Sequence, residues 1–169
     1  GGSPVTFVQS AFGGGSFGGS SCTATFSANV TAGDAIAVAI QWNASSSLNI
    51  SSVTDSLGNA YTLSASSKSQ TSATHYAAIG TQIAYATNIA GGANTVTVTF
   101  SAGANGSCSV IEVSAAHLDQ AAAGAGSSGA VNPGTASTTV NGSFGIAIGS
   151  IDDGTGIGSI FGSGTGWNL

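Results

Sequence analysis

Charged residues are nearly absent from this sequence. Of its 169 residues one is basic, Lys68, and six are acidic, which gives a net charge of −5. Proteins that bind nucleic acid or an anionic membrane surface neutralise phosphates with clustered lysines and arginines. A single lysine cannot do this, so we expect neither kind of partner.

Long apolar runs and methionine are missing as well. No segment approaches the roughly 18 consecutive apolar residues of a transmembrane helix, so we expect no membrane span. The chain is nevertheless 41% hydrophobic, whereas disordered chains combine few apolar residues with high net charge. Its length and composition therefore predict one folded unit with a proper core.

The apolar residues recur with the two-residue period of strands, and no stretch has helical period. Residues 35–43, AIAVAIQWN, are apolar on both faces and predict a central strand covered on both sides. The other expected strands are residues 4–12, 21–30, 48–54, 60–64, 75–87, 95–100, 107–114, 136–141 and 143–151. Residues 65–74 and 115–134 are expected to be loops, and Gly80 a bulge. About ten short strands of this kind predict an all-β, antiparallel sandwich of jelly-roll or immunoglobulin-like type.

The first twenty residues differ in composition from the rest. A short strand, residues 4–12, precedes the glycine-rich segment GGGSFGGS, which we expect to be a flexible hinge rather than regular structure. We therefore divide the chain into residues 1–20, a strand with a hinge, and residues 21–169, the β-sandwich.

Two cysteines, Cys22 and Cys108, form the only possible disulfide pair. Closing a loop of that length contributes about 4–5 kcal/mol in the chain-entropy model. Strand phase complicates the pairing, because Cys22 shares a face with Phe26 whereas Cys108 lies opposite Ile111 and Val113. Two buried free thiols are the alternative.

No set of residues converges on a catalytic or cofactor site. His75 and His117 are the only histidines, and although Asp119 follows the second closely, no serine stands in a strained nucleophile turn. We expect no enzymatic activity, no cofactor and no zinc site. Asp152 and Asp153 are only a weak calcium candidate, because calcium takes 6 to 8 oxygen ligands, usually with several carboxylates. A plain solvated turn is the favoured explanation of the pair.

Carbohydrate enters the predictions in two ways. Five asparagines stand in N-x-[ST] sequons and are candidates for glycosylation: Asn29, Asn43, Asn49, Asn105 and Asn141. Covalent glycans would solubilise a surface that lacks charge. Aromatic side chains that could instead stack on sugars are Trp42, Trp167, Tyr61, Tyr76 and Tyr85. Of the two tryptophans, Trp42 is expected in the core and Trp167 free in the tail.

Several segments resemble a recurring β-sandwich domain of secreted and surface bacterial proteins. They are FVQSA (7–11), VTAGDAIAVAIQW (30–42), VTDSLGNAYTL (53–63), AYATNIAGGANTVTVTF (84–100) and VIEVS (110–114). The resemblance covers roughly residues 5–150 and implies no catalytic residues. It also implies further strands after the GSGTGW segment, where the present sequence stops. We therefore expect one sheet to lack an edge partner, which invites pairing with another chain.

These observations predict a non-enzymatic structural protein, extracellular or on the cell surface. We expect copies of the chain to form a glycan-coated filament or surface layer, a homopolymer held by strand exchange. The residues expected to enter a neighbouring subunit are Val5, Phe7, Val8 and Phe12. A carbohydrate-binding or adhesion module of a larger secreted protein is the alternative.

Overall fold

The computed structural model describes most of the chain up to Ser114 and short stretches beyond it. The described residues are 5–44, 46–64, 67–70, 78–114, 116–117, 119–120, 137, 139, 144–146, 148, 150–152 and 157–159. They contain no helix, and hence none long and apolar enough to cross a membrane. Every strand pairing among them is antiparallel. The expected all-β, antiparallel class is confirmed, whereas the sandwich type and the number of strands stay predictions.

The strands are numbered in their order along the chain. They are β1 (Phe7–Gly14), β2 (Gly19–Thr25), β3 (Ala35–Ala44), β4 (Ile50–Asp55), β5 (Thr62–Leu63), β6 (Ser67–Gln70), β7 (Ala78–Thr87), β8 (Thr95–Val113), β9 (Ser150–Asp152) and β10 (Ile157–Ser159). The first eight belong to one sheet, and β9 and β10 form a separate pair.

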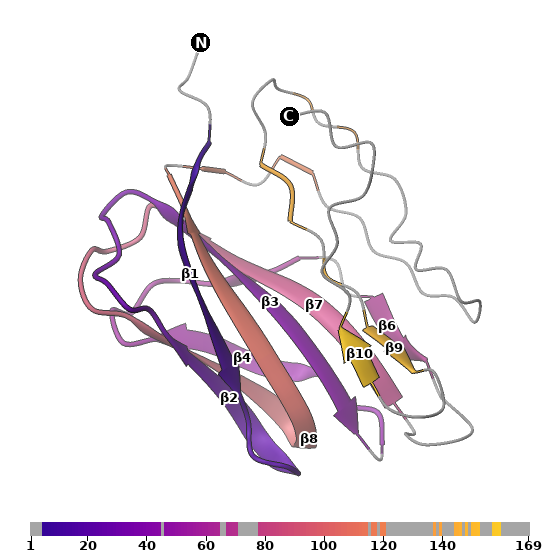
Figure 1. Ribbon diagram of the computed structural model, residues 1–169. Coiled ribbons are helices and arrows are strands. Elements are labelled where there is room, and N and C mark those ends of the chain that lie inside the picture. The colour runs from indigo at the N-terminus through magenta and orange to yellow at the C-terminus, as the bar shows by residue number, and fades with distance from the viewer. Residues whose placement is uncertain are drawn as a thin grey trace.

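The sheet is organised around β8, a strand of 19 residues. One side of β8 pairs with β1 along its second half and with β2 along its first half. The other side of β8 pairs with β3 along its second half and with β4 along its first half. Figure 1 shows β8 folding back on itself near its label, so that β2 and β4 lie below β1 and β3 in this view. Beyond β3 the sheet continues through β7 to β5 and β6.

The main core lies between the two limbs of the folded sheet. One limb is the second half of β8 with β1, β3 and β7, and the other is the first half of β8 with β2 and β4. Along β8 the even-numbered residues are buried from Val96 to Phe100 and again from Ala104 to Glu112. They meet Cys22 and Ala24 of β2 and the bulky residues of β3 in one cluster. The alternate residues of β3 are buried as well but lie outside that cluster: Ala35, Ala37 and Ala39. Both faces of β3 are therefore covered, as the sequence predicted.

Two aromatic rings at the centre of the core require glycines beside them. The ring centroids of Trp42 and Phe100 lie 6.2 Å apart. A Cβ on Gly80 would lie 2.3 Å from the indole of Trp42, and one on Gly106 would lie 2.3 Å from the ring of Phe100. Trp42 is 4% exposed, so its core placement is confirmed. The bulge expected at Gly80 is wrong, because β3 and β7 pair without a register shift and Gly80 instead makes room for the indole.

Other boundaries differ from those expected because pairing partners override local composition. Residues 95–100 and 107–114 were expected as two strands, but β8 is continuous, with Ala104 paired to Gly19 and the amide of Ser101 donating to the carbonyl of Asn49. The glycine-rich hinge shrinks to residues 15–18, since β1 runs through Gly14 and β2 begins at Gly19. The expected loop 65–74 contains β6.

The C-terminal expectations are met only in part. Residues 137 and 139 are not in a strand, and the rest of the strand expected at 136–141 lies outside the described residues. Of residues 143–151, the described positions before β9 are not in a strand either.

Candidate functional site

The segment expected to leave the subunit, β1, is paired within its own chain. Its residues Phe7 to Gly14 lie in register with Val113 to Ser107 of β8. Gln9, Ala11 and Gly13 face the interior, because their partners on β8 are Glu112, Val110 and Cys108. These inward positions hold β1 through three different kinds of contact.

At the first position a carboxylate is buried and held by neutral donors. Glu112 has no exposed surface. Its Oε2 accepts a 2.7 Å hydrogen bond from Nε2 of Gln9, and its Oε1 accepts a 2.7 Å bond from the backbone amide of Thr31. A buried carboxylate is costly unless it is hydrogen-bonded. Gln9 therefore donates one of the two hydrogen bonds that stabilise the Glu112 carboxylate in the core.

The amide of Gln9 also joins β1 to the segment after β2. Its Nε2 lies 3.3 Å from the carbonyl of Ala28 and 3.4 Å from that of Asn29. Its Oε1 accepts a 3.4 Å hydrogen bond from the amide of Ala28. One side chain of β1 therefore contacts both β8 and the loop that leads to β3.

At the remaining inward positions side chains are small or absent. Ala11 packs against the core cluster. A Cβ on Gly13 would lie 1.8 Å from the carbonyl oxygen of Thr23, and one on Gly15 would lie 2.3 Å from that of Ser21. At Gly14, which points the other way, a Cβ would meet nothing within 4 Å. The alternation shows that β2 crosses directly under the end of β1 and leaves no room for a side chain there.

The outer face of β1 carries exposed apolar side chains. A register shift between Phe7 and Gln9 places Phe7 opposite Val113, on the same face as Phe12 opposite Ser109. The exposed fractions are 55% for Phe7 and 71% for Phe12, and Phe17 in the following loop is 90% exposed. Val8 is exposed too. An open hollow of about 320 Å³ lies beside Phe12, lined by Ser10, Ala11, Phe12, Ser109 and Ile111.

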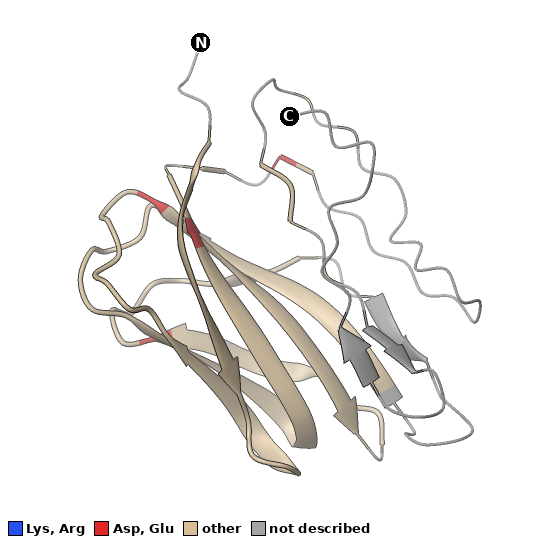
Figure 2. Cartoon of the chain, viewed as in Figure 1, with Lys and Arg blue, Asp and Glu red and all other residues tan. Residues whose placement is uncertain are grey.

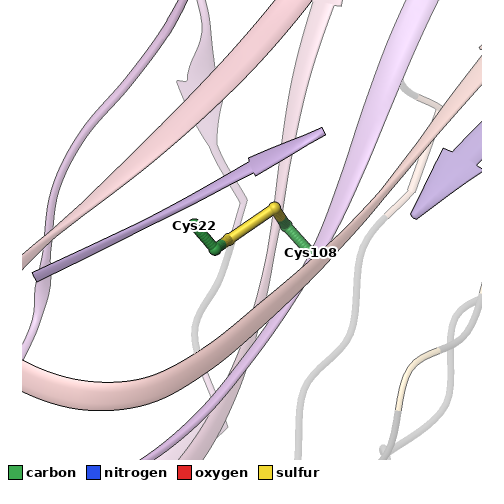
Figure 3. Close-up of a disulfide and its surroundings, with 2 residues drawn as sticks. All are labelled: Cys22 and Cys108. Carbon is green, nitrogen blue, oxygen red and sulfur yellow. A yellow bond between two sulfur atoms is a disulfide. The ribbon is translucent and has the colours of Figure 1, made fainter. Parts of the chain in front are cut away.

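The two cysteines are joined in a disulfide (Figure 3), the pairing expected from the sequence. Their Cα atoms lie 6.3 Å apart, within the usual range. The bond connects β2 to the second half of β8 and so ties the two limbs of the sheet together. The phase conflict seen in the sequence disappears because the buried phase of β8 runs through Cys108, Val110 and Glu112 rather than through Ile111.

A second polar network, which is partly buried, lies at the turn after β4. The carboxylate of Asp55 accepts hydrogen bonds from the amides of Leu57 and Asn59 and from the side chains of Asn59, Tyr61 and Asn94, at 2.7 to 3.1 Å. Burial raises the pKa of Asp55, but these hydrogen bonds outweigh it and hold the pKa below its ordinary 3.8. Burial, the charge of Asp55 and the shared hydrogen bond raise the pKa of Tyr61. Residues 55–60, DSLGNA, have the composition of a turn in which an aspartate accepts a backbone amide two residues on, and the bond from the amide of Leu57 confirms that turn.

A second open hollow, of about 330 Å³, is lined by amide side chains next to the loop after β1. Nδ2 of Asn105 donates a 2.8 Å hydrogen bond to Oδ1 of Asn43, and the amide of Gly18 donates to Oδ1 of Asn105. Gln41 and the exposed Phe17 complete the polar and aromatic lining. No sequence pattern indicates a role for Phe17, because it stands among glycines in a segment expected to lack structure.

The sequons differ in accessibility. Asn29 and Asn49 are exposed, whereas Asn43 is buried and hydrogen-bonded to the partly buried Asn105. Asn141 lies outside the described residues. Because an acceptor amide must be reachable by solvent, the structure favours Asn29 and Asn49.

The structure describes only some of the weak catalytic, calcium and sugar-binding candidates. His117 is exposed, and Asp119 accepts a hydrogen bond from the amide of Thr139 at 2.7 Å. Asp152 lies in β9, while other candidates fall outside the described residues: His75, Tyr76, Asp153 and Trp167. Figure 2 shows only a few charged positions along the described chain. Among those residues no three His, Cys, Asp or Glu side chains are grouped to hold a metal ion.

No protein-family model, no curated protein and no solved structure matches the chain.

Proposed function

We propose that this chain is a non-enzymatic structural subunit, extracellular or on a cell surface, that assembles with copies of itself by exchanging β1. The observation that carries the proposal is the concentration of exposed apolar side chains on one short segment. Phe7, Val8, Phe12 and Phe17 all lie within eleven residues of chain and are exposed. Contiguous exposed apolar surface marks sites of association.

The position of β1 at the edge of the sheet supports the same proposal. Within the described residues β1 pairs with β8 alone, so its other side presents unpaired backbone groups. Long apolar edge strands are templates for a second chain. The connection from β1 to β2 is residues 15–18, and short hinge loops of this kind favour exchange of an element between copies. Each copy that donates β1 onward and accepts one from behind extends a fibre.

The extracellular location and the sandwich type belong to the proposal as well. Disulfides persist in oxidising compartments, and Cys22–Cys108 ties the core of the fold. Two of the segments that resemble a sandwich domain of secreted and surface proteins supply the Asp55 network, since Asn94 of residues 84–100 donates to Asp55 of residues 53–63. Glycans at Asn29 and Asn49 would coat a surface that carries few charges.

Light scattering on the purified full chain tests the proposal. Assembly predicts masses that are multiples of 16.0 kDa. Phe7→Ser with Phe12→Ser is expected to lower them, because these side chains form the exposed apolar surface that favours association of the copies. Leu63→Ser is the matched control, because Leu63 is an exposed apolar residue of β5, away from β1. A wild-type chain that remains a monomer at every concentration contradicts the proposal.

Carbohydrate binding is the second candidate, and the hollow beside Phe17 favours it. Exposed aromatic faces next to amide side chains are typical of a site that takes a ligand with many hydroxyls. A glycan array probed with the full chain tests it, and Phe17→Ala abolishes any binding that uses this hollow. Binding that survives Phe17→Ala places the sugar site elsewhere.

A further inference from the structure

We infer that the place β1 occupies beside β8 is a selective slot, which accepts from a second copy only a strand with the pattern Gln-x-Ala-x-Gly-x-Gly. In this chain the pattern is Gln9, Ala11, Gly13 and Gly15. The inference rests on the proposed exchange of β1 and names the chemistry by which the exchanged strand is recognised.

The first element of the slot is the buried carboxylate of Glu112. With β1 removed, the Glu112 carboxylate loses the 2.7 Å hydrogen bond that Gln9 donates to Oε2. Of these two bonds it keeps only the one that the amide of Thr31 donates to Oε1. An incoming strand must therefore bring a donor to this point. An apolar side chain leaves the carboxylate unsatisfied and an acidic one repels it, so both are rejected.

The second element is steric and lies four residues further along. The carbonyl oxygens of Thr23 and Ser21 stand 1.8 Å and 2.3 Å from the positions that a Cβ would take on Gly13 and Gly15. Both contacts are with backbone of β2, which cannot turn aside as a flexible side chain would. Only glycine is accepted at these two positions.

Together the two elements fix the register of the incoming strand. A slip by one residue turns every inward side chain outward. A slip by two in one direction brings Ala11 against Glu112 and Phe17 to the place of Gly15. A slip by two in the other direction brings Phe7 against Glu112 and Ala11 to the place of Gly13. The outward positions Ser10, Phe12 and Gly14 face away from Glu112 and β2, so the slot does not select the residues that stand there.

Competition by a labelled peptide of residues 5–16 tests the slot on the intact full chain. The wild-type peptide and its Gly14→Ala variant are expected to exchange into the protein equally well. Gln9→Glu is expected to weaken incorporation at least about tenfold, and Gly13→Ala to abolish it. Incorporation is measured as fluorescence that co-elutes with the protein.

The outcomes separate the slot from the assembly. Four peptides that incorporate equally, or none that incorporates, overturn the slot even if the full chain polymerises, since the copies then associate by the outer face of β1. Selective incorporation into a chain that stays monomeric supports the slot and contradicts the proposed function.

Discussion

The side-chain amide of Gln9 donates a 2.7 Å hydrogen bond to Glu112, a carboxylate with no exposed surface. The bond crosses from an edge strand with an exposed apolar face to the strand around which the sheet is organised. It adds a buried polar contact to the backbone pairing and the apolar packing that hold β1.

Removing this contact from the Glu112 side is expected to destabilise the fold strongly. Glu112→Ala leaves the amides of Gln9 and Thr31 without their acceptor and opens a cavity, at a cost of about 2–4 kcal/mol. Urea denaturation measures the change. Glu112→Gln keeps the shape and one acceptor, so its cost is expected to be smaller. An unchanged midpoint for Glu112→Ala would show that the network does not stabilise the fold.

The Asp55 network is expected to make stability depend on acid. The folded-state pKa of Asp55 is lowered, so its contribution is fully present above the unfolded pKa of about 3.9 and is lost as the pH falls through the folded value. Asp55→Asn removes that contribution at neutral pH, at a cost of about 1–1.5 kcal/mol because the carboxylate is only partly buried. The stability of this variant is also expected to fall less steeply as the pH is lowered. Denaturation at several pH values between 7 and 2 measures both effects.

Asn94 and Tyr61 provide graded controls for that experiment. Each donates one of the hydrogen bonds to Asp55, so Tyr61→Phe is expected to cost about 1 kcal/mol. Asn94 is buried, and Asn94→Ala is expected to cost more. If the free energy of unfolding of Asp55→Asn and of the wild type falls equally between pH 7 and pH 2, other carboxylates cause the pH dependence.

The contact between Gly80 and Trp42 is expected to tolerate no side chain. Gly80→Ala pushes a methyl group to 2.3 Å from the indole, and overpacking of this kind costs about 1–3 kcal/mol. Gly14→Ala is the control, because a Cβ there meets nothing within 4 Å. Thermal unfolding followed by tryptophan fluorescence distinguishes the two variants, and equal midpoints would contradict the packing described.

The disulfide is expected to contribute about 4 kcal/mol by restricting the unfolded chain. A Cys22→Ala, Cys108→Ala variant should remain all-β and unfold at lower denaturant concentration than the oxidised protein. Thiol titration of the unfolded wild type under non-reducing conditions should find no free thiol. Two titratable thiols in protein from an oxidising compartment would contradict the bond.

Glycopeptide mass spectrometry of native material is expected to find glycans at Asn29 and Asn49 and none at the buried Asn43. Occupancy at Asn43 with Asn29 and Asn49 bare would mean that modification precedes folding. An intact mass equal to that of the polypeptide would exclude glycosylation altogether.

Local sequence patterns predicted those parts of the fold that depend on neighbouring residues. The two apolar phases of residues 35–43 predicted β3 within one residue, and the acid and glycine of DSLGNA predicted the Asp55 turn. The core position of Trp42 followed from the same alternation.

Features that depend on distant residues could not be predicted in this way. Glu112 reads as an outward position because it is charged, and only the arrival of Gln9 and Thr31 makes it an inward one. Gly13 and Gly15 have no room for a side chain because β2 passes beneath them, a contact invisible in the sequence. The continuity of β8 through residues 101–104 likewise depends on partners in other strands.

Exchange of β1 between copies is tested most directly by trapping it with a disulfide. Ser10 and Ile111 lie opposite one another in the register of β1 and β8, at a separation that a disulfide spans. One chain carries Ser10→Cys and another carries Ile111→Cys, so that no link can form within a chain. Mixing and oxidation are predicted to give a linked pair of twice 16.0 kDa, and chains with Leu63→Cys in place of Ser10→Cys are predicted to give none. No linked pair above that control would contradict exchange of the strand.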